Sequence, residues 1–248
     1  MLMLLKFLYR LLSKQAMKAI LEGRLKERGH PAAGRFLPSE VRTIHRQAWA
    51  EVEGLLPQVQ LSEVPTWGNR HNVFLAVLSV AMYHALLERG VDRDYAIELF
   101  ADVGWKLYVK FLVVPKAIAR LRTPDPQEQM NLVLQMLLRF PFNAPGRPGY
   151  EVKGYSVGRS KFITDWTYCP PFDYVKQYVE KHGDRGEVQA FFRSWCQYDW
   201  ALAYAIAEGT GQPGWYQRPH ALSQGDDICD MTWSVQQPAD ESAERLPA

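Results

Sequence analysis

The cysteines of this chain are the residues best suited to chemistry, and all three fall in the C-terminal third. Cys169 precedes two prolines, Cys196 lies three residues before Asp199, and Cys229 stands in the run Gly-Asp-Asp-Ile-Cys-Asp. A thiol near a carboxylate can be a nucleophile with an acid–base partner, a metal ligand, or a small buried side chain. The clustering therefore predicts a single site in the last third of the chain.

The densest group of acidic and thiol side chains is Asp226, Asp227, Cys229 and Asp230. A Gly-Asp-Asp turn that leads into a strand would place Asp227 and Cys229 on the same face, so that both reach one cavity. Flanking carboxylates raise the pKa of a thiol unless a cation such as Arg218 compensates. The alternative interpretation is a tight turn in which the aspartates bond the local backbone.

A second carboxylate interrupts the apolar segment 187–208, which predicts a helix. Asp199 lies three residues after Cys196, so the two side chains occupy neighbouring positions on one helix face. Burying an aspartate without a partner is costly. Asp199 is therefore either satisfied by a donor elsewhere in the fold or kept for function, and we favour function.

Polar residues also open the apolar segment 69–89, where Asn69, Arg70 and His71 follow Gly68. The first amides of a helix bind anions, and Arg70 or His71 would add a clamp for a carboxylate. These residues are candidates for substrate binding. The alternative is that Asn69 serves only as the N-cap of the helix.

A metal site built from Cys169, Cys196, Asp199 and Cys229 is conceivable, because thiolates bind soft metals. The chain has no Cys-x-x-Cys pair, however, and its histidines show no metal-binding spacing. The sequence therefore predicts neither a metal nor another cofactor.

Composition limits the class of protein and the partners. At 248 residues, with 47% hydrophobic and 23% charged residues, the chain is typical of a soluble globular protein. A net charge of +2 with no concentrated basic face outside the N-terminus argues against nucleic acid as a partner. Three widely spaced cysteines imply free thiols and a reducing cytoplasm.

The N-terminus is an apolar segment with regularly spaced cations. It is too short to span a bilayer and lacks the cleavage site of a signal peptide, so it predicts an amphipathic helix. The basic stripe comprises Lys6, Arg10, Lys14 and Lys18, and the apolar face includes Leu4, Leu5, Leu8, Leu11, Leu12, Ala16, Ala19 and Ile20. Residues 1–28 then rest on an anionic inner-membrane surface or pack on the domain or a second subunit.

Helical periodicity dominates from residue 40 to about 140 and then gives way to strand patterns. Asp92 and Asp125 are expected N-caps in the helical part. Segments 150–157 and 161–168 predict a hairpin, and helices follow from Pro170 and over 187–208. A second hairpin is expected from 215–222 and 228–235.

This order predicts an α+β fold, with an N-terminal helical layer packed against a small antiparallel sheet of hairpins and two further helices. Residues 1–38 form the basic helix and a linker. A single domain spans 39–235, and the polar segment 236–248 is expected to be a disordered tail.

The run from Tyr216 to Trp233 resembles the C-terminal signature of the L-2-amino-thiazoline-4-carboxylic acid hydrolase family. That signature is an arginine, a short strand, and Gly-Asp-x-x-Cys-Asp followed by an aromatic residue. The Cys-x-x-Asp of residues 196–199 and Cys169 resemble the family's two earlier cysteine motifs. The likeness covers most of residues 40–235 and is most specific over the last seventy of these.

The resemblance implies a hydrolase that opens a cyclic thiazoline, or a related small carbon–nitrogen substrate, to an N-carbamoyl product. Such a reaction needs water or a thiolate to add at C2, a proton-handling group, and a clamp for the substrate carboxylate. The implied roles are Cys229 as nucleophile, Asp227 or Asp199 as acid–base group, and Arg218, Arg70 or His71 as clamp. Cys196 completes the catalytic set, and Asn69, Asp226 and Asp230 the substrate-binding set.

The same Gly-Asp-x-x-Cys turn and helix–hairpin order are also similar to the vinyl reductase-like small-molecule-binding domain of sensors and accessory proteins. In that case the cluster lines a ligand pocket without turnover, and the tryptophans contribute more than the thiols. Thiol reactivity separates the two hypotheses, because an enzyme of this kind needs one cysteine of low pKa.

Overall fold

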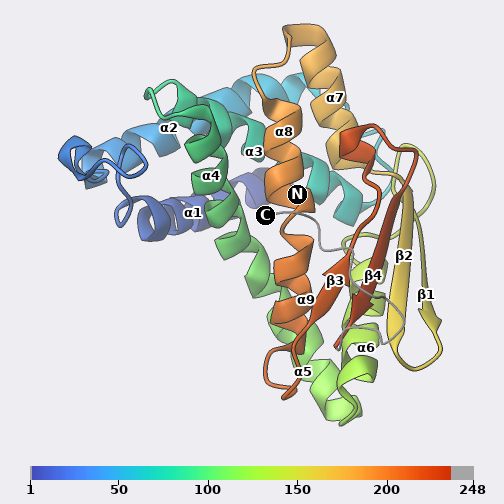
Figure 1. Cartoon of the computed structure of the whole chain (residues 1–248). Helices are drawn as coiled ribbons and strands as arrows, with labels where there is room; N and C mark the ends of the chain where they lie inside the picture. Colours follow the sequence, from blue (N-terminus) through green and yellow to red (C-terminus); the bar gives the residue numbers. More distant parts are fainter. Residues whose placement is uncertain (1, 236–248) are drawn as a thin grey trace.

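The computed structural model describes residues 2–235, with side chains from residue 5 onward. Its helices are α1 (Leu2–Leu21), α2 (Pro38–Leu55), α3 (Trp67–Leu87), α4 (Arg93–Tyr108), α5 (Val113–Arg122), α6 (Pro126–Arg139), α7 (Pro170–His182), α8 (Glu187–Phe191) and α9 (Asp199–Ala207). Its strands are β1 (Glu151–Val157), β2 (Lys161–Tyr168), β3 (Trp215–Gln217) and β4 (Cys229–Ser234) (Figure 1). The predicted α+β class is confirmed. The segment 236–248, expected to be a disordered tail, lies outside the described residues.

Helix boundaries in the first half follow local capping rules. Asp92 accepts hydrogen bonds from the backbone amides of Asp94 at 3.0 Å and Tyr95 at 3.1 Å, and α4 starts at the next residue. Asp125 accepts one from the amide of Glu128 at 2.7 Å, just before α6. These bonds satisfy amides that have no partner within the helix, so both predicted N-caps are confirmed.

The single helix predicted over 187–208 is interrupted. Helix α8 passes into a wider π-helical turn, η4 (Phe192–Cys196), before α9 begins at Asp199. The hydroxyl of Ser194 donates to the carbonyl of Ala190 at 2.6 Å, and such back-bonding competes with the regular helical ladder. The interruption matters because Cys196 and Asp199 lie at its far end.

The four strands form one antiparallel sheet in the order β1-β2-β4-β3. Along β4 the buried residues Cys229, Met231 and Trp233 alternate with more exposed ones, as a strand with one covered face requires. Helices α6 and α9 contact the sheet, and Figure 1 shows α9 beside β3. Strand β3 is shorter than predicted, because the chain leaves it after Gln217 and forms a short turn, η5 (Leu222–Gln224).

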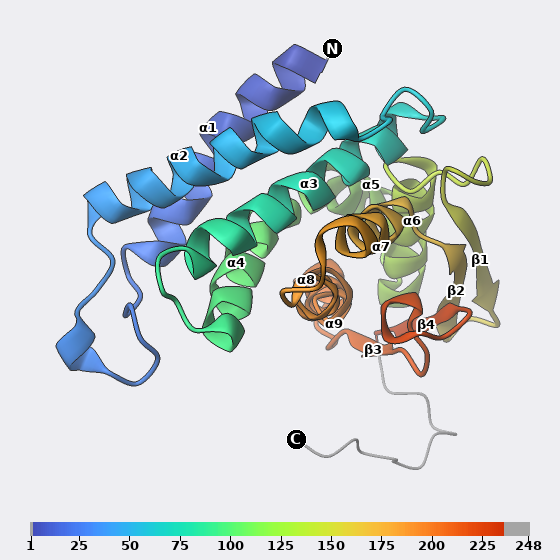
Figure 2. The same cartoon turned by 90° about the horizontal axis from the view of Figure 1, so that it is seen from above.

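Two apolar clusters form the core. The first joins α1 to α4 with α7 and α8, and Trp49 and Phe74 are buried at its centre. The second joins α6 and α9 to the covered face of the sheet, where Phe162 and Trp233 are buried. Figure 2 shows α1, α2 and α3 side by side as a layer. Helices α7, α8 and α9 lie between this layer and the sheet. Side chains of both clusters therefore form the walls of any site that lies between them.

Helix α1 packs on this core through Tyr9, Met17 and Leu21, which are buried. The apolar face expected from the sequence is right in part: Leu5, Leu12, Ala16 and Ile20 pack on the core, whereas Leu8 and Leu11 are exposed. The buried face is centred on Tyr9 and Met17, about two helical turns apart. Among the described residues, no helix combines the length and the apolar character needed to cross a membrane.

Candidate functional site

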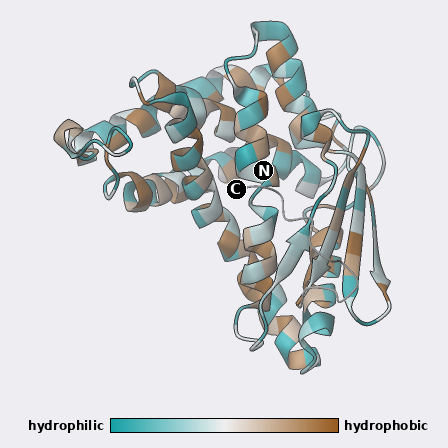
Figure 3. Cartoon of the chain, in the orientation of Figure 1, coloured by the Kyte–Doolittle hydropathy of each residue, from teal (hydrophilic) through white to brown (hydrophobic). Residues whose placement is uncertain are grey.

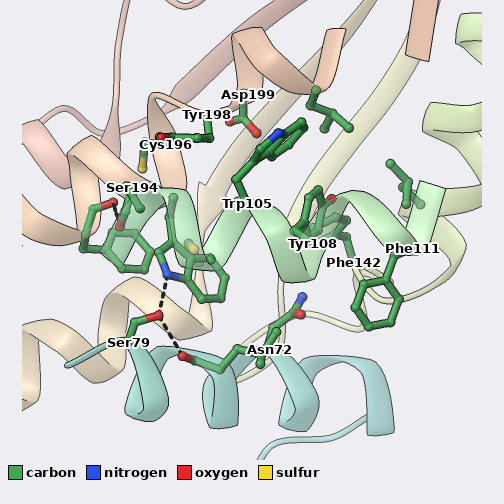
Figure 4. A pocket seen from close by; sticks show the side chains of 18 of the residues that line it. Asn72, Ser79, Trp105, Tyr108, Phe111, Phe142, Ser194, Cys196, Tyr198 and Asp199 are labelled. Carbon is green, nitrogen blue, oxygen red and sulfur yellow. Dashed lines mark hydrogen bonds between the residues drawn. The ribbon is translucent and has the colours of Figure 1, made fainter. Parts of the chain in front are cut away.

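A cavity of about 190 Å³ lies where the two apolar clusters meet. Helices α3 and α4 form one wall, and α6, the η4–α9 segment and the covered face of β2 and β4 form the others. Figure 4 shows Asn72 and Ser79 of α3 on one wall, Cys196 and Asp199 on the opposite wall, and Trp105 and Tyr108 of α4 between them. The lining is predominantly aromatic and apolar, and includes Trp105, Tyr108, Phe142, Trp166, Trp195 and Trp233.

All three cysteines line this cavity. Cys169 stands between β2 and α7, Cys196 ends η4, and Cys229 begins β4. They come from three elements that are neighbours only in the folded chain. The sequence predicted one site in the last third of the chain without deciding whether the cysteines meet, and the structure brings all three to one cavity.

The surroundings of the thiols keep them protonated at neutral pH. Burial raises the pKa of Cys229 to about 12, although the backbone amide of Leu222, which donates to its sulfur at 3.1 Å, lowers it in part. Burial also raises the pKa of Cys169 well above its ordinary value. It raises that of Cys196 too, where the nearby Arg218 opposes the shift. The structure thus places no activated thiolate at the cavity.

The charged pair at the cavity is Asp199 and Arg218. The guanidinium donates to the Asp199 carboxylate at 2.7 Å, to the hydroxyl of Tyr216 at 2.7 Å, and to the carbonyl of Cys196. Only 6% of the Arg218 side chain is exposed, against 25% for Asp199, which lines the cavity. The accessible part of the pair is therefore the carboxylate.

Burial raises the pKa of Asp199 to about 6, and Arg218 limits that rise. Burial alone would lower the pKa of Arg218, but the carboxylate more than offsets this and holds it above the ordinary value. A carboxylate that titrates near 6 is mostly ionised at neutral pH and accepts a proton readily. Asp199 is thus the group at the cavity best suited to bind a donor or to take a proton.

The other predicted aspartates lie outside the cavity. Asp226 accepts from the amide of Ala221 at 2.7 Å, and Asp230 accepts from the amide of His220 and pairs with its ring, both at 2.9 Å. Asp227 is exposed in the turn. Strand alternation begins only at Cys229, so the expected shared face of Asp227 and Cys229 does not form. Asp226 and Asp230, which we assigned to substrate binding, thus bond the backbone amides of nearby residues instead.

The polar residues at the start of α3 also serve the fold. Thr66 is the N-cap and accepts from the amide of Asn69 at 3.2 Å. The Asn69 side chain then bonds the carbonyl of Pro141 at 3.2 Å and the amide of Tyr150 at 3.2 Å, which ties α3 to the segment before β1. Gly68 permits this approach, since a Cβ there would lie 2.6 Å from the Pro141 carbonyl oxygen.

Neither Arg70 nor His71 lines the cavity. Arg70 donates to the carbonyls of Val64 at 2.6 Å and Ser62 at 3.3 Å. His71 bonds the hydroxyl of Tyr9 at 2.6 Å, and burial lowers its pKa to about 4. The proposed carboxylate clamp at this helix end is therefore not brought to the cysteines.

Several lining residues escaped the sequence analysis. Asn72 donates to the hydroxyl of Tyr150 at 3.0 Å, and the indole of Trp195 donates to Ser79 at 3.0 Å. The buried indole nitrogen of Trp166 has no acceptor among the described residues. The only signal in the sequence was the richness in tryptophan, which does not say which rings converge.

Within the described part of the chain, no group of three or more histidine, cysteine or acidic side chains is arranged to hold a metal ion. Comparison of the chain with family models, curated proteins and solved structures finds no match.

Proposed function

We propose that this protein binds a small, flat, largely apolar molecule that donates one hydrogen bond, from an N–H or O–H group, to Asp199. An apolar cavity of about 150 Å³ in another protein holds benzene, so a cavity of about 190 Å³ suits a molecule of one or two rings. Aromatic walls with a few placed polar groups are typical of ligand sites. The observation that carries the proposal is the cavity-facing carboxylate of Asp199 within an aromatic lining.

The state of the thiols supports binding over thiol catalysis. Cys229, with a pKa of about 12, accepts a hydrogen bond from Leu222 instead of resting beside a base. Protonated thiols behave as small apolar side chains that pack against rings. In this proposal the cysteines shape the cavity and Asp199 supplies its specificity.

Calorimetric titration with indole and indene tests the proposal, because the two molecules share a shape and only indole carries an N–H group. We expect indole to bind about tenfold or more tightly, since hydrogen bonds to charged groups contribute about 1.5–3 kcal/mol. The variant Asp227→Asn, which removes an exposed carboxylate outside the cavity, is the matched control and keeps the preference. Equal affinity for both molecules, or no binding of either, contradicts the proposal.

A second candidate is hydrolysis of a cyclic amidine, and the pKa of Asp199 near 6 favours it specifically. Asp199 would take a proton from water as the water oxygen adds to the amidine carbon of a thiazoline. It would return that proton to the sulfur as the carbon–sulfur bond of the ring breaks. The second proton of the water would move from the added oxygen to the ring nitrogen, which leaves the carbonyl of the N-carbamoyl product. This assignment moves the main role from Cys229 to Asp199.

The test is release of a free thiol from L-2-amino-thiazoline-4-carboxylate. Turnover that survives in Cys229→Ser but is lost in Asp199→Asn supports this second candidate. Turnover lost in Cys229→Ser returns the nucleophile to the thiol, and no turnover by the unmodified protein leaves binding as the function.

A further inference from the structure

Large apolar side chains are exposed on two segments that are distant in sequence. On α1 these are Phe7 (63%), Leu8 (47%) and Leu11 (47%). On the short turn η3 (Val109–Leu112) and on α5 they are Phe111 (38%), Val113 (65%), Val114 (65%), Ile118 (37%) and Leu121 (88%). These eight residues, with the lysines and the arginines of the same two segments, form what we call the basic apolar face. Exposed apolar residues gathered in this way mark an interaction site.

The same two segments are cationic and free of carboxylates. No aspartate or glutamate occurs in residues 1–21 or 103–124, although the chain has 27 of them and a net charge of only +2. Lys6, Lys14, Lys18, Lys106, Lys110 and Arg122 form no ion pair within the described residues. Arg120 forms none either, but its guanidinium donates to the backbone carbonyl of Glu208. Figure 3 shows hydrophobic and hydrophilic residues interleaved along α5. The charge is thus complementary to an anionic surface.

The two segments are joined through one buried histidine. Tyr9 of α1 bonds His71 at 2.6 Å, and the ring of Phe111 lies edge-on to the His71 ring at 5.7 Å between centroids. Trp67, 42% exposed, stacks on the other side of His71 at 5.7 Å. The start of α1 and the η3 turn therefore lie one side-chain layer apart.

Phe111 belongs to both the exposed face and the cavity lining. A surface that covered the face would lie next to the cavity, and an apolar ligand partitions into a bilayer. This continuity favours a membrane over a protein as the occupant.

We propose that the basic apolar face docks the protein on an anionic phospholipid membrane. Interfacial segments of this kind combine bulky apolar residues, which enter the headgroup region, with lysines, which meet anionic lipids. The face keeps Leu8, Leu11 and three lysines of the amphipathic helix expected from the sequence, and it adds Phe7, η3 and α5.

Co-sedimentation of the full chain with vesicles tests this proposal. We expect binding to vesicles of phosphatidylcholine with about one third phosphatidylglycerol, and at least about tenfold weaker binding to pure phosphatidylcholine, because each cation near an anionic surface adds affinity. The variants Val113→Ser/Val114→Ser and Lys106→Gln/Lys110→Gln should each weaken binding several-fold. Circular dichroism establishes that both remain folded.

The matched control is Trp200→Ser/Tyr204→Ser. These rings, each 54% exposed, lie on α9 outside the face, so their loss should leave vesicle binding unchanged. Equal binding to both kinds of vesicle, no binding to either, or equal effects of the control and the face variants overturns the proposal. So does a dimer in analytical ultracentrifugation that the face variants abolish, since it assigns the face to a second copy of the chain.

Discussion

Two buried clusters of charged side chains, one in each half of the molecule, differ in their relation to the cavity. In the helical half, His84 of α3 bonds Glu51 of α2 at 2.5 Å and Glu187 of α8 at 2.6 Å. In the C-terminal half, Arg218 bonds Asp199 at 2.7 Å. The histidine cluster lies outside the cavity, whereas the aspartate–arginine pair lines it.

The pKa values of both clusters are strongly shifted, for different reasons. Burial alone would lower the pKa of His84, but its hydrogen bonds to Glu187 and Glu51 raise it to about 9. Burial instead dominates at Asp199 and raises its pKa to about 6. A shifted pKa therefore does not identify a functional group by itself. What distinguishes the two is their position: the histidine cluster joins three helices away from the cavity, whereas the aspartate–arginine pair lines the cavity, where a ligand would contact it.

The variant Arg218→Met should have the largest effect. It removes the partner of a buried carboxylate, and breaking such a pair costs about 3–5 kcal/mol. We expect a loss of that size in the free energy of unfolding, measured by urea denaturation.

The double variant Arg218→Met/Asp199→Leu should recover part of this loss, because it leaves no unpaired charge. If the double variant is no more stable than the single one, the unpaired carboxylate is not the cause of the loss in Arg218→Met. The two clusters would then differ less than the geometry indicates.

The variant His84→Gln tests the structural assignment of the other cluster. Since the folded pKa of His84 is about 9, against about 6.5 in the unfolded chain, its contribution is complete below pH 6.5 and is lost as pH rises through 9. The unmodified protein should lose on the order of 3 kcal/mol over that window, measured by urea denaturation at each pH.

The His84→Gln variant should be less stable at neutral pH and nearly independent of pH in that window, with its affinity for indole unchanged. A variant that keeps its stability but loses indole binding would reverse the roles assigned to the two clusters. The unmodified protein should also lose stability at acid pH, as the pH falls towards 2, because hydrogen bonding to His84 holds the pKa of Glu187 near 2.

The variant Asp199→Asn should act on the ligand as well as on the fold, because it also leaves the buried Arg218 guanidinium without its carboxylate. The preference for indole over indene should grow as pH rises through about 6 in the unmodified protein, because the carboxylate accepts hydrogen bonds best when ionised. In the variant the preference should fall by about tenfold at pH 7 and become independent of pH. Calorimetric titration at pH 5, 6 and 7 measures both effects. A preference that does not change with pH in the unmodified protein assigns the ligand contact to another group.

The smallest effect is expected for Cys229→Ser. With a pKa of about 12 the thiol is protonated, so the substitution should change indole affinity by less than about threefold. Iodoacetamide should label the folded protein at pH 7 more slowly than free cysteine, because little thiolate is present. Rapid labelling of Cys229 would instead indicate an activated nucleophile and support thiol catalysis.

The sequence by itself determined the local elements. Asp92 and Asp125 begin α4 and α6 through bonds within three residues, and the alternation at Cys229, Met231 and Trp233 assigns one face of β4. These features depend on neighbours along the chain, where spacing and propensity are sufficient. The α+β order follows from them.

Only the tertiary structure decided the site. The pairing of Asp199 with Arg218, the convergence of Cys169 with Cys196 and Cys229, and the exposure of Asp227 all depend on contacts between separate elements. The π-helical turn before α9 shifts the register of the predicted helix, and nothing in its apolar pattern indicates this. Long-range packing sets which polar groups share a cavity, and local spacing carries no information about it.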